Sequence, residues 1–452
     1  MAEIKRSLVL AERAVPRYTS YPTAAQFEDN FPVSVADQWL VELPQDASLS
    51  LYVHIPFCQQ LCWYCGCHTS VPNSYERATN YLESLVRDIE RSASLNGAHR
   101  GSVRHLHFGG GTPTYLSNAD LGHLIATIRK HFDLSPSAEL ALESDPRTIT
   151  RERAFGLASL GFNRISFGVQ DFAIPVQMKI NRLQPYGLVA NVTAMLREAG
   201  FTSINFDLMY GLPSQTTASV CKTALEAAEL RPNRISVFGY AHVPWFKKHQ
   251  QMISDADLPG VVERYEQATA IYQKLVEAGY IAIGLDHFAL PGDALERAAS
   301  AGTLHRNFQG YTTDRTDALL AFGASAISEF PQGFAQAARD TLSWSTAISQ
   351  EKSPTVRGLI LTAQDRMRSD IIENIMCNFS ADYGQIAKLH GYDEDLLIES
   401  VERLAPMIGA GLATLEGTTV RVPRKYRLFL RSVAAAFDDH FTGTKNRYAK
   451  AI

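Results

Sequence analysis

Short runs rich in β-branched and aromatic residues recur along the first half of the chain, separated by longer stretches with helical periodicity. The runs that read as strands are 49–56, 104–110, 138–146, 164–170, 204–211 and 234–244. Between the first two, segment 75–90 places Leu82, Leu85, Val86 and Ile89 on one helical face. Strands that alternate with helices predict a parallel sheet with right-handed crossover connections.

Three further segments are expected to be helices. They are 117–132, with Ser117 or Asn118 as its N-cap, then 183–200 and 216–229. Six strand and helix units in sequence favour an α/β fold built on a partial or complete (β/α) barrel.

The pattern changes near residue 360, where helical stretches, a small hairpin and another helix follow one another. We therefore divide the chain into an N-terminal segment, 1–48, a barrel with its extension, 49–360, and an α-rich C-terminal domain, 361–452. A winged-helix arrangement is one form that this last domain could take. Within the extension, segment 279–291 is a candidate for one more strand after the sixth unit.

Composition and charge narrow the class of protein. The hydrophobic fraction of 46% is ordinary for a globular protein, and the net charge of -4 comes without a large basic block, so we expect no nucleic-acid partner. No apolar run is long enough to span a membrane, and the N-terminal residues do not resemble a signal peptide. We expect a cytoplasmic, monomeric protein whose thiols stay reduced.

Chemically distinctive residues lie late in each of the six expected strands or directly after it. These positions are Cys58 to Cys67, the glycine-rich stretch 109–114, Glu143 and Asp145, Gln170, Asp207, and finally Ala241 and His242. Loops collect such residues in any protein, which would explain one or two of these positions. Their presence at six consecutive strand ends predicts a functional site at the carboxyl end of the barrel.

The strongest chemical signal is a loop with four of the six cysteines of the chain: Cys58, Cys62, Cys65 and Cys67. A zinc site would usually use two separated pairs, and a redox dithiol would leave two of the four without a role. An iron–sulfur cluster suits the compact C-x3-C-x2-C spacing, because three thiolates can bind three corners of a cubane. Three ligands would leave one iron open to another molecule.

The stretch "CQQLCWYC" resembles the cysteine motif of the radical S-adenosylmethionine (SAM) enzymes, and "GGGTPT" resembles the glycine-rich strand of that superfamily. A narrower resemblance covers almost the whole chain. The stretches "PRYTSYPTA", "LYVHIPFC", "GGGTPTYL", "FGVQDF", "DLMYGLP", "GLDHFA" and "HRNFQGYTT" together resemble the oxygen-independent coproporphyrinogen III oxidases. The fourth cysteine, Cys67, also fits the pattern of this family.

The resemblance implies a role for individual residues. Cys58, Cys62 and Cys65 would hold a 4Fe-4S cluster with one open iron, and Cys67 would lie near the substrate with a catalytic part. Two SAM molecules are implied, and the positions that match their contacts are Tyr52, Tyr64, Gly110, Gly111, Thr112, Glu143, Gln170, Arg182, Asp207, Ala241 and Ile327. From the residues alone, two alternatives stay open: Cys67 as a buried small apolar residue, and Arg182 as a solvated residue at a helix start.

The implied substrate is coproporphyrinogen III, which carries four propionates on a flexible apolar ring. Two propionates would be converted to vinyl groups, giving protoporphyrinogen IX, with an unidentified low-potential electron donor supplying the cluster. Cations and aromatic residues should line its pocket. The candidates are Arg17, Tyr18, Tyr21, His305 and Arg306. We also expect the C-terminal domain to cover the mouth of the barrel.

Related proteins with other functions are the alternatives. Haem chaperone-like relatives usually lack the cysteine at position 67 and carry an H-N-x-x-Y-W stretch, where this chain has "HRNFQGY". Porphyrin- or haem-modifying methyltransferases share the same core. A cluster or haem carrier without turnover would have no need for Glu143, Gln170, Arg182 and Asp207.

Overall fold

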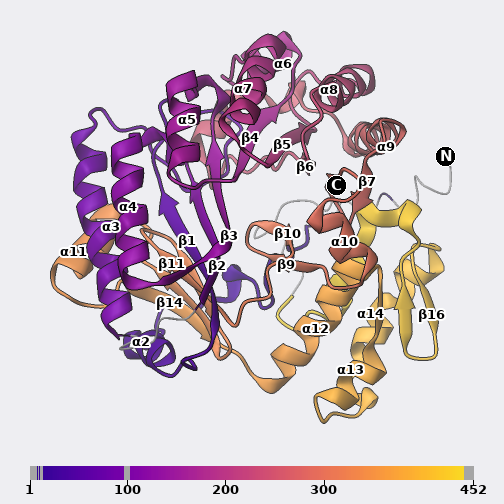
Figure 1. Ribbon diagram of the computed structural model, residues 1–452. Helices are drawn as coiled ribbons and strands as arrows, with labels where there is room; N and C mark the ends of the chain where they lie inside the picture. Colours follow the sequence, from indigo (N-terminus) through magenta and orange to yellow (C-terminus); the bar gives the residue numbers. More distant parts are fainter. Residues whose placement is uncertain (1–7, 9, 11–13, 96–101, 442–452) are drawn as a thin grey trace.

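A single curved sheet of twelve strands organises the chain, in the order β14-β13-β12-β11-β1-β2-β3-β4-β5-β6-β8-β7. The computed structural model describes residues 8, 10, 14–95 and 102–441 (Figure 1). Six neighbouring strands run parallel. They are β1 (Ser48–Ile55), β2 (Ser102–Gly110), β3 (Asp133–Ser144), β4 (Arg164–Gln170), β5 (Ser203–Tyr210) and β6 (Arg234–Gly239). These are the six strands expected from the sequence.

Helices connect the parallel strands and cover the outer face of the sheet (Figure 1). They are α3 (Glu76–Leu95), α4 (Asn118–His131), α5 (Arg151–Ser159), α6 (Ile174–Lys179), α7 (Tyr186–Ala199), α8 (Thr217–Glu229) and α9 (Val261–Glu277). Ser117 is the N-cap of α4, since its side chain accepts a hydrogen bond from the backbone of Asp120. Leu49, Leu51 and Val53 of β1 are fully buried, as expected for a parallel strand covered on its outer face.

The barrel is partial, because the first and last strands of the sheet do not pair with each other. On one side β11 (Ala318–Phe322) pairs with β1 in parallel, and β12 (Ile327–Phe330), β13 (Gly333–Ala337) and β14 (Thr355–Ile360) follow antiparallel. On the other side, the single strand expected at 279–291 is instead a hairpin of two short strands, β7 (Ile281–Ile283) and β8 (His287–Ala289). The chain turns at Gly284, whose φ of 50° lies in the left-handed region.

The C-terminal residues form a smaller unit on the side of the sheet opposite α3 and α4 (Figure 1). Its elements are α12 (Ala363–Asn378), β15 (Ser380–Asp382), α13 (Tyr383–Leu389), α14 (Ile398–Gly409), β16 (Thr414–Glu416), β17 (Thr419–Arg421) and α15 (Leu430–Ala434). The three strands form one sheet, so helix, strand, two helices and hairpin follow in winged-helix order. The domain boundaries remain predictions.

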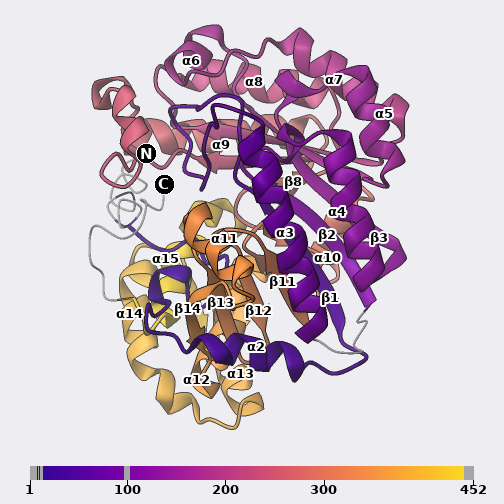
Figure 2. The ribbon, with the colours of Figure 1, turned by 90° about the vertical axis from the view of Figure 1, so that its left-hand side faces the viewer.

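The N-terminal segment packs into this smaller unit. Leu8, Val15, Tyr18 and Tyr21 share a hydrophobic core with buried residues of α12, α14 and α15. Two of the remaining helices, α2 (Val33–Val41) and α11 (Thr341–Ser349), pack against α3 (Figure 2). The short strands β9 (His305–Asn307) and β10 (Gly310–Thr312) lie between the sheet and the smaller unit (Figure 1), and α10 (Ala294–Ser300) adds buried residues to the core of that unit. In the part of the chain that the structure describes, no helix combines the length and apolar character needed to cross a bilayer.

Candidate active site

The cysteine loop begins directly after β1, at the carboxyl end of the parallel strands. Its start is fixed by the backbone: the N–H of Cys58 donates to the carbonyl of Ser70 (3.0 Å), and that of Ser70 donates to Pro56 (2.7 Å). Further along, the side-chain amide of Asn181 donates to the carbonyl of Leu61 (2.9 Å). The loop is therefore held from both the β1 side and the segment after α6.

The thiol of Cys58 lies between two threonine hydroxyls. Its Sγ is 3.1 Å from Oγ1 of Thr69 and 3.3 Å from Oγ1 of Thr112, which follows the glycine-rich strand. Burial raises the pKa of this thiol, and the two hydroxyls oppose that effect by hydrogen bonding to the thiolate. Thr112, one of the expected SAM contacts, thus touches a cysteine of the loop.

Cys62 is buried against the guanidinium of Arg182. Nη1 of Arg182 is 3.3 Å from Sγ of Cys62 and 3.3 Å from Oδ2 of Asp145, while Nε and Nη2 donate to the carbonyl of Gly168 (3.1 and 2.7 Å). Arg182 is only 7% exposed, so the alternative of a solvated residue at a helix start is wrong. Arg147 also reaches Sγ of Cys62, at 3.8 Å, so two guanidinium groups lie beside this sulfur.

Cys65 and Cys67 lie side by side at the end of the loop. The backbone N–H of Cys67 is 3.4 Å from Sγ of Cys65, and hydrogen bonding from Cys67 lowers the pKa of the Cys65 thiol to about 7. Cys67 itself is exposed, so the reading of a buried apolar residue is wrong. Two side chains from a later segment close over this end: Lys247 donates to the carbonyl of Cys67 (2.8 Å), and a ring nitrogen of His249 lies 2.7 Å from the carbonyl of Cys65.

This donor set fits three thiolate ligands. Cys58, Cys62 and Cys65 each have a hydrogen-bond donor beside the sulfur, and such outer contacts orient and stabilise metal-bound thiolates. Among the described residues, no three His, Cys, Asp or Glu side chains converge in a way that suits a single metal ion. A cubane cluster offers a different iron to each thiolate, so its ligands need not converge on one point.

The glycines at the end of β2 allow that strand to lie against the cysteine loop. The N–H of Gly111 donates to the carbonyl of Ile55 (2.8 Å), and a Cβ on Gly111 would lie 2.8 Å from the carbonyl oxygen of Phe57. Gly110 has a φ of 111°, which glycine adopts readily, and its N–H donates to Oε2 of Glu143 (3.1 Å). The close approach within the chain itself therefore requires glycine here.

Glu143 is the centre of a polar group on the inner face of the barrel. Its Oε1 is 3.4 Å from Nε2 of His107, whose ring stacks on that of Tyr52 with 5.9 Å between centroids. The hydroxyl of Tyr52 is 3.1 Å from Nδ1 of His54. Burial raises the pKa of Glu143, but hydrogen bonds from His107 and Gly110 outweigh it and lower the pKa below its ordinary value. Glu143 is therefore an ionised acceptor at neutral pH.

Asp207 lies on β5 facing the same space. It accepts hydrogen bonds from Ser166 (3.1 Å) and Asn205 (2.8 Å). Burial and the nearby charge of Glu143 raise its pKa to about 6. Glu143 and Asp207 line a cavity of about 220 Å³ inside the barrel. Two carboxyl groups with different proton affinities thus share one cavity.

A buried glutamine, Gln250, ties together two of the expected SAM contacts. Its side-chain amide donates to the carbonyls of Tyr64 (2.9 Å) and Ala241 (3.3 Å), and its Oε1 accepts from the N–H of Val243 (2.6 Å). Sequence reasoning missed Gln250 because it lies in a short 3-10 helix, Lys248–Met252, with no motif around it. Ala241 itself lies in the loop beyond β6, which ends at Gly239.

Two expected contacts remain to be placed. Gln170 ends β4 with a φ of 64° and is buried, and its side chain lies against Gly168, beside Arg182. Ile327 begins β12, where it packs against a small cluster of Phe27, Phe334 and Leu359. The structure therefore places Gln170 with the other expected contacts, whereas the neighbours of Ile327 belong to a separate group.

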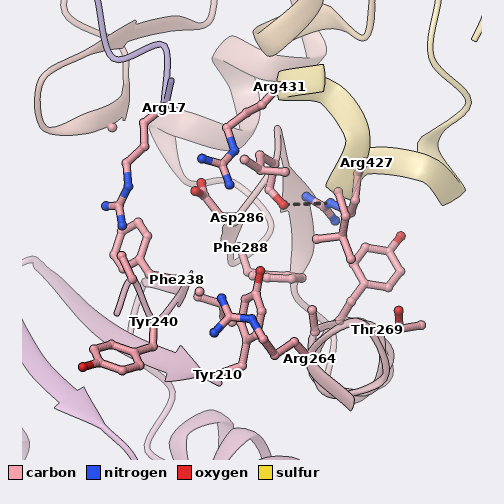
Figure 3. A pocket seen from close by; sticks show the side chains of 18 of the residues that line it. Arg17, Tyr210, Phe238, Tyr240, Arg264, Thr269, Asp286, Phe288, Arg427 and Arg431 are labelled. Atoms are coloured by element: carbon pink, nitrogen blue, oxygen red, sulfur yellow. Dashed lines mark hydrogen bonds between the residues drawn. The ribbon is translucent and has the colours of Figure 1, made fainter. Parts of the chain in front are cut away.

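A second cavity of about 340 Å³ adjoins the first, and the two share Phe238, Phe308 and Gln309 as wall residues. Figure 3 shows side chains from distant segments pointing into it. Its cationic residues are Arg17, Arg264, Arg306, Arg424, Lys425, Arg427 and Arg431, and aromatic residues such as Tyr210, Tyr240 and Phe288 complete the wall. This cavity can bind an apolar ligand that carries several negative charges.

Only part of the expected substrate set lies here. Arg17 and Arg306 line this cavity, so Arg17 is not a free tail residue. Tyr18, Tyr21 and His305 instead line a different cavity of about 540 Å³ near α12. The hydroxyl of Tyr18 donates to Asp438 (3.0 Å), and a ring nitrogen of His305 is 2.8 Å from Oε1 of Glu373. Sequence reasoning missed the cavity arginines of the C-terminal unit. The net charge of the chain is negative, and nothing in the local sequence shows that these side chains face inward.

A partial barrel with a three-cysteine loop at its carboxyl end defines the class of radical SAM proteins. The model of the radical SAM superfamily matches residues 52–227 of this chain. Coproporphyrinogen III oxidase from Escherichia coli, a radical SAM enzyme, has a similar solved structure. It shares 40% identity with a TM-score of 0.89, over 94% of this chain and 98% of that one.

Curated relatives narrow the class to one family. The oxygen-independent coproporphyrinogen III oxidase of Bradyrhizobium diazoefficiens is 47% identical over 441 residues, which cover 98% of this chain and 98% of the relative. That of Escherichia coli (strain K12) is 41% identical over 429 residues, covering 94% and 93%. The chain belongs to the family of oxygen-independent coproporphyrinogen III oxidases.

Proposed function

We propose that the protein converts coproporphyrinogen III to protoporphyrinogen IX without oxygen. Each of two propionates loses a hydrogen atom from its β-carbon, one electron and carbon dioxide, and a vinyl group remains. The observation that carries this proposal is the cavity with six arginines and one lysine that adjoins the polar interior of the barrel. Such a cavity suits the four carboxylates and the apolar ring of this substrate.

Cys58, Cys62 and Cys65 would hold a 4Fe-4S cluster, and three ligands would leave one iron open for SAM. When bound, the reduced cluster and SAM together supply a 5′-deoxyadenosyl radical, which can abstract a hydrogen atom from the substrate. Two SAM molecules are expected. Their proposed contacts are Tyr52, Tyr64, Gly110, Gly111, Thr112, Glu143, Gln170, Arg182, Asp207, Ala241 and Ile327.

The side chains of the barrel interior supply complementary hydrogen bonding. Glu143 is an ionised acceptor for an ammonium group or for ribose hydroxyls. Asp207 has a pKa of about 6, and its ionised carboxylate can accept a hydrogen bond from a hydroxyl. Arg182 is already bonded to Gly168, Asp145 and Cys62, so its main action on the cofactor is to orient the loop and hold positive charge beside it.

The arginines of the second cavity hold the propionates that are not reacting. The ring of the substrate packs against Phe238 and Phe308, the residues that both cavities share, so the reacting propionate faces the barrel interior. Arg424, Arg427 and Arg431, from the C-terminal unit, line the same cavity, and with substrate bound they would help to keep water from the reacting centre. Cys67, exposed at the end of the loop, is a candidate for a catalytic contact with the substrate.

We expect a separate low-potential electron donor to reduce the cluster and a terminal acceptor to take up the electron that leaves the substrate. We further propose that the protein works as a monomer in the cytoplasm, where a reducing environment keeps the loop thiols free.

A direct assay tests the proposal. The protein is purified without oxygen, its cluster is reconstituted, and SAM, a strong reductant and coproporphyrinogen III are added. We expect 5′-deoxyadenosine, carbon dioxide and protoporphyrinogen IX as products. Deoxyadenosine without loss of carbon dioxide would point to a related enzyme with another substrate. Protein that binds zinc and shows no cluster absorption would overturn the proposal as a whole.

A further inference from the structure

One carboxylate lies among the cations of the second cavity. Asp286 sits in the turn between β7 and β8, within the stretch "GLDHFA", and projects into the same space as Arg17 and Arg431 (Figure 3). Among the described residues that line this cavity, it is the sole acidic side chain. A cavity built only to bind carboxylates would not contain one of its own, so Asp286 needs a separate explanation.

The contacts of Asp286 leave one of its oxygens available. Oδ1 lies 2.7 Å from Nδ1 of His287 and 4.0 Å from Nη1 of Arg306. Within the described part of the chain, Oδ2 has no hydrogen-bond partner. The guanidinium of Arg427 is engaged elsewhere, since it donates to the carbonyl of Leu285 (3.1 Å) and lies over the ring of Tyr272. Asp286 therefore does not act mainly as a hydrogen-bonded partner of these arginines.

The charge on Asp286 is retained in this cavity. Burial raises its pKa, but the hydrogen bond with His287 and the nearby charges of Arg306 and Arg431 more than offset burial and keep the pKa far below its ordinary range. An ionised carboxylate with a free oxygen that faces a cavity calls for a ligand with hydrogen-bond donors. Because the carboxylates of the substrate offer none at neutral pH, the donors must lie elsewhere on the ligand.

We propose that Asp286 accepts hydrogen bonds from the pyrrole N–H groups of the bound tetrapyrrole, while the surrounding arginines hold its propionates. This inference rests on the proposed function and extends it to the orientation of the ring. A porphyrinogen has four pyrrole N–H groups, and its saturated bridges let the ring pucker so that several of them converge on one acceptor. A fully oxidised porphyrin is planar, has two N–H groups and directs two lone pairs to its centre. Asp286 is thus a residue that selects the reduced ring.

The test compares two tetrapyrroles that carry the same four propionates. Coproporphyrinogen III and coproporphyrin III are titrated without oxygen into protein loaded with cluster and SAM, in the absence of reductant so that no turnover occurs. We expect the native protein to bind the porphyrinogen more tightly by on the order of tenfold or more. Asp286→Asn keeps the size of the side chain and should lower this ratio at least about fivefold, mainly by weakening porphyrinogen binding.

Arg264→Met is the matched control, because it removes a propionate partner from the same cavity. It should weaken both ligands and leave their ratio unchanged. An Asp286→Asn protein that binds both ligands equally less well would make Asp286 a mere organiser of the arginines and overturn the inference. A ratio near one in the native protein would overturn it without any variant, should Asp286→Asn fail to fold. If neither tetrapyrrole binds to the native protein, the proposed function itself fails.

Discussion

The guanidinium of Arg182 joins the cysteine loop to the end of β3, because its Nη1 lies 3.3 Å from Sγ of Cys62 and 3.3 Å from Oδ2 of Asp145. The same side chain donates twice to the carbonyl of Gly168 on β4. One planar group thus fixes the middle of the loop relative to two parallel strands. Arginine suits this position because its donors are held in a rigid fork.

Lysine at this position cannot make the same set of bonds. Arg182→Lys should lower the free energy of unfolding by about 3 kcal/mol, because a buried carboxylate loses one of its partners and a carbonyl loses two donors. Iron retained per chain after anaerobic gel filtration should also fall. Arg151→Lys is the control, since Arg151 pairs with Glu198 at an exposed site. Native iron content and native thermal stability in Arg182→Lys would contradict the role we assign.

The second prediction separates Cys67 from the cluster ligands. In Cys67→Ser the backbone N–H that reaches Cys65 is preserved, so iron content and cluster absorption should stay at the native level. Decarboxylation should fall by about a hundredfold or more, because the thiol would no longer be present beside the reacting group. Cys221→Ser, in α8, is the matched control and should leave both quantities unchanged. Loss of iron from Cys67→Ser would instead make Cys67 a ligand.

The third prediction concerns Gln250, which bonds the cysteine loop at Tyr64 to the segment after β6. Gln250→Ala removes three hydrogen bonds to Tyr64, Ala241 and Val243. It should cost about 2 kcal/mol of unfolding free energy, because two part-buried carbonyls lose their donor and the N–H of Val243 loses its acceptor. The cluster should then be lost faster to a chelator, followed by its visible absorption. Gln251→Ala changes the exposed neighbour and should match the native rate. Equal rates of cluster loss in both variants would show that Gln250 does not hold the loop.

The fourth prediction tests the cationic cavity by steady-state kinetics. Arg264 projects from α9 into the cavity, with its guanidinium 5.7 Å from the ring of Tyr210. Arg264→Met keeps much of the length of the side chain but removes the charge, so KM for coproporphyrinogen III should rise about ten- to a hundredfold. Lys274→Met, on the exposed side of the same helix, should leave KM unchanged. An unaltered KM in Arg264→Met would place the propionates elsewhere.

Much of the barrel could be predicted from the sequence, because parallel strands buried under helices are continuous apolar runs that any local pattern reveals. Leu49, Leu51 and Val53 are an example. The hairpin at Ile281–Ile283 and His287–Ala289 could not be separated from a single strand, since the turn at Gly284 depends on packing against Tyr311. Short strands without regular alternation carry little local information.

The site was predictable as far as its motifs reach. Cys58, Cys62 and Cys65 form one local pattern, and Glu143 and Asp207 follow from their positions late in strands. Gln250 lies outside every motif, and Asp286 lies within "GLDHFA", whose letters do not show that this carboxylate enters a cavity of arginines. The same holds for the arginines of segment 424–431, which line a cavity whose other walls come from residues distant in sequence. Tertiary packing, not local sequence, brings these groups to the site.

The last prediction concerns Asp88, a carboxyl group buried in α3. It accepts hydrogen bonds from the backbone of Gly323 (3.0 Å) and from the indole of Trp344 (3.2 Å), which join α3 to the segments after β11 and in α11. Burial raises its pKa to about 6, although both hydrogen bonds act in the opposite direction. Between pH 4 and 6, Asp88 is therefore protonated in the native state but ionised in the unfolded chain.

Because the folded pKa is the higher one, the contribution of Asp88 to stability is complete below pH 4 and declines as the pH rises through 6. Asp88→Asn mimics the protonated form at every pH. Its free energy of unfolding, relative to that of the native protein, should therefore increase by about 1.5 kcal/mol from pH 5 to pH 8. Urea denaturation of both proteins across this range measures the difference, and other titrating groups cancel in the comparison. A difference that stays constant or decreases with pH would mean that Asp88 is ionised in the native fold throughout.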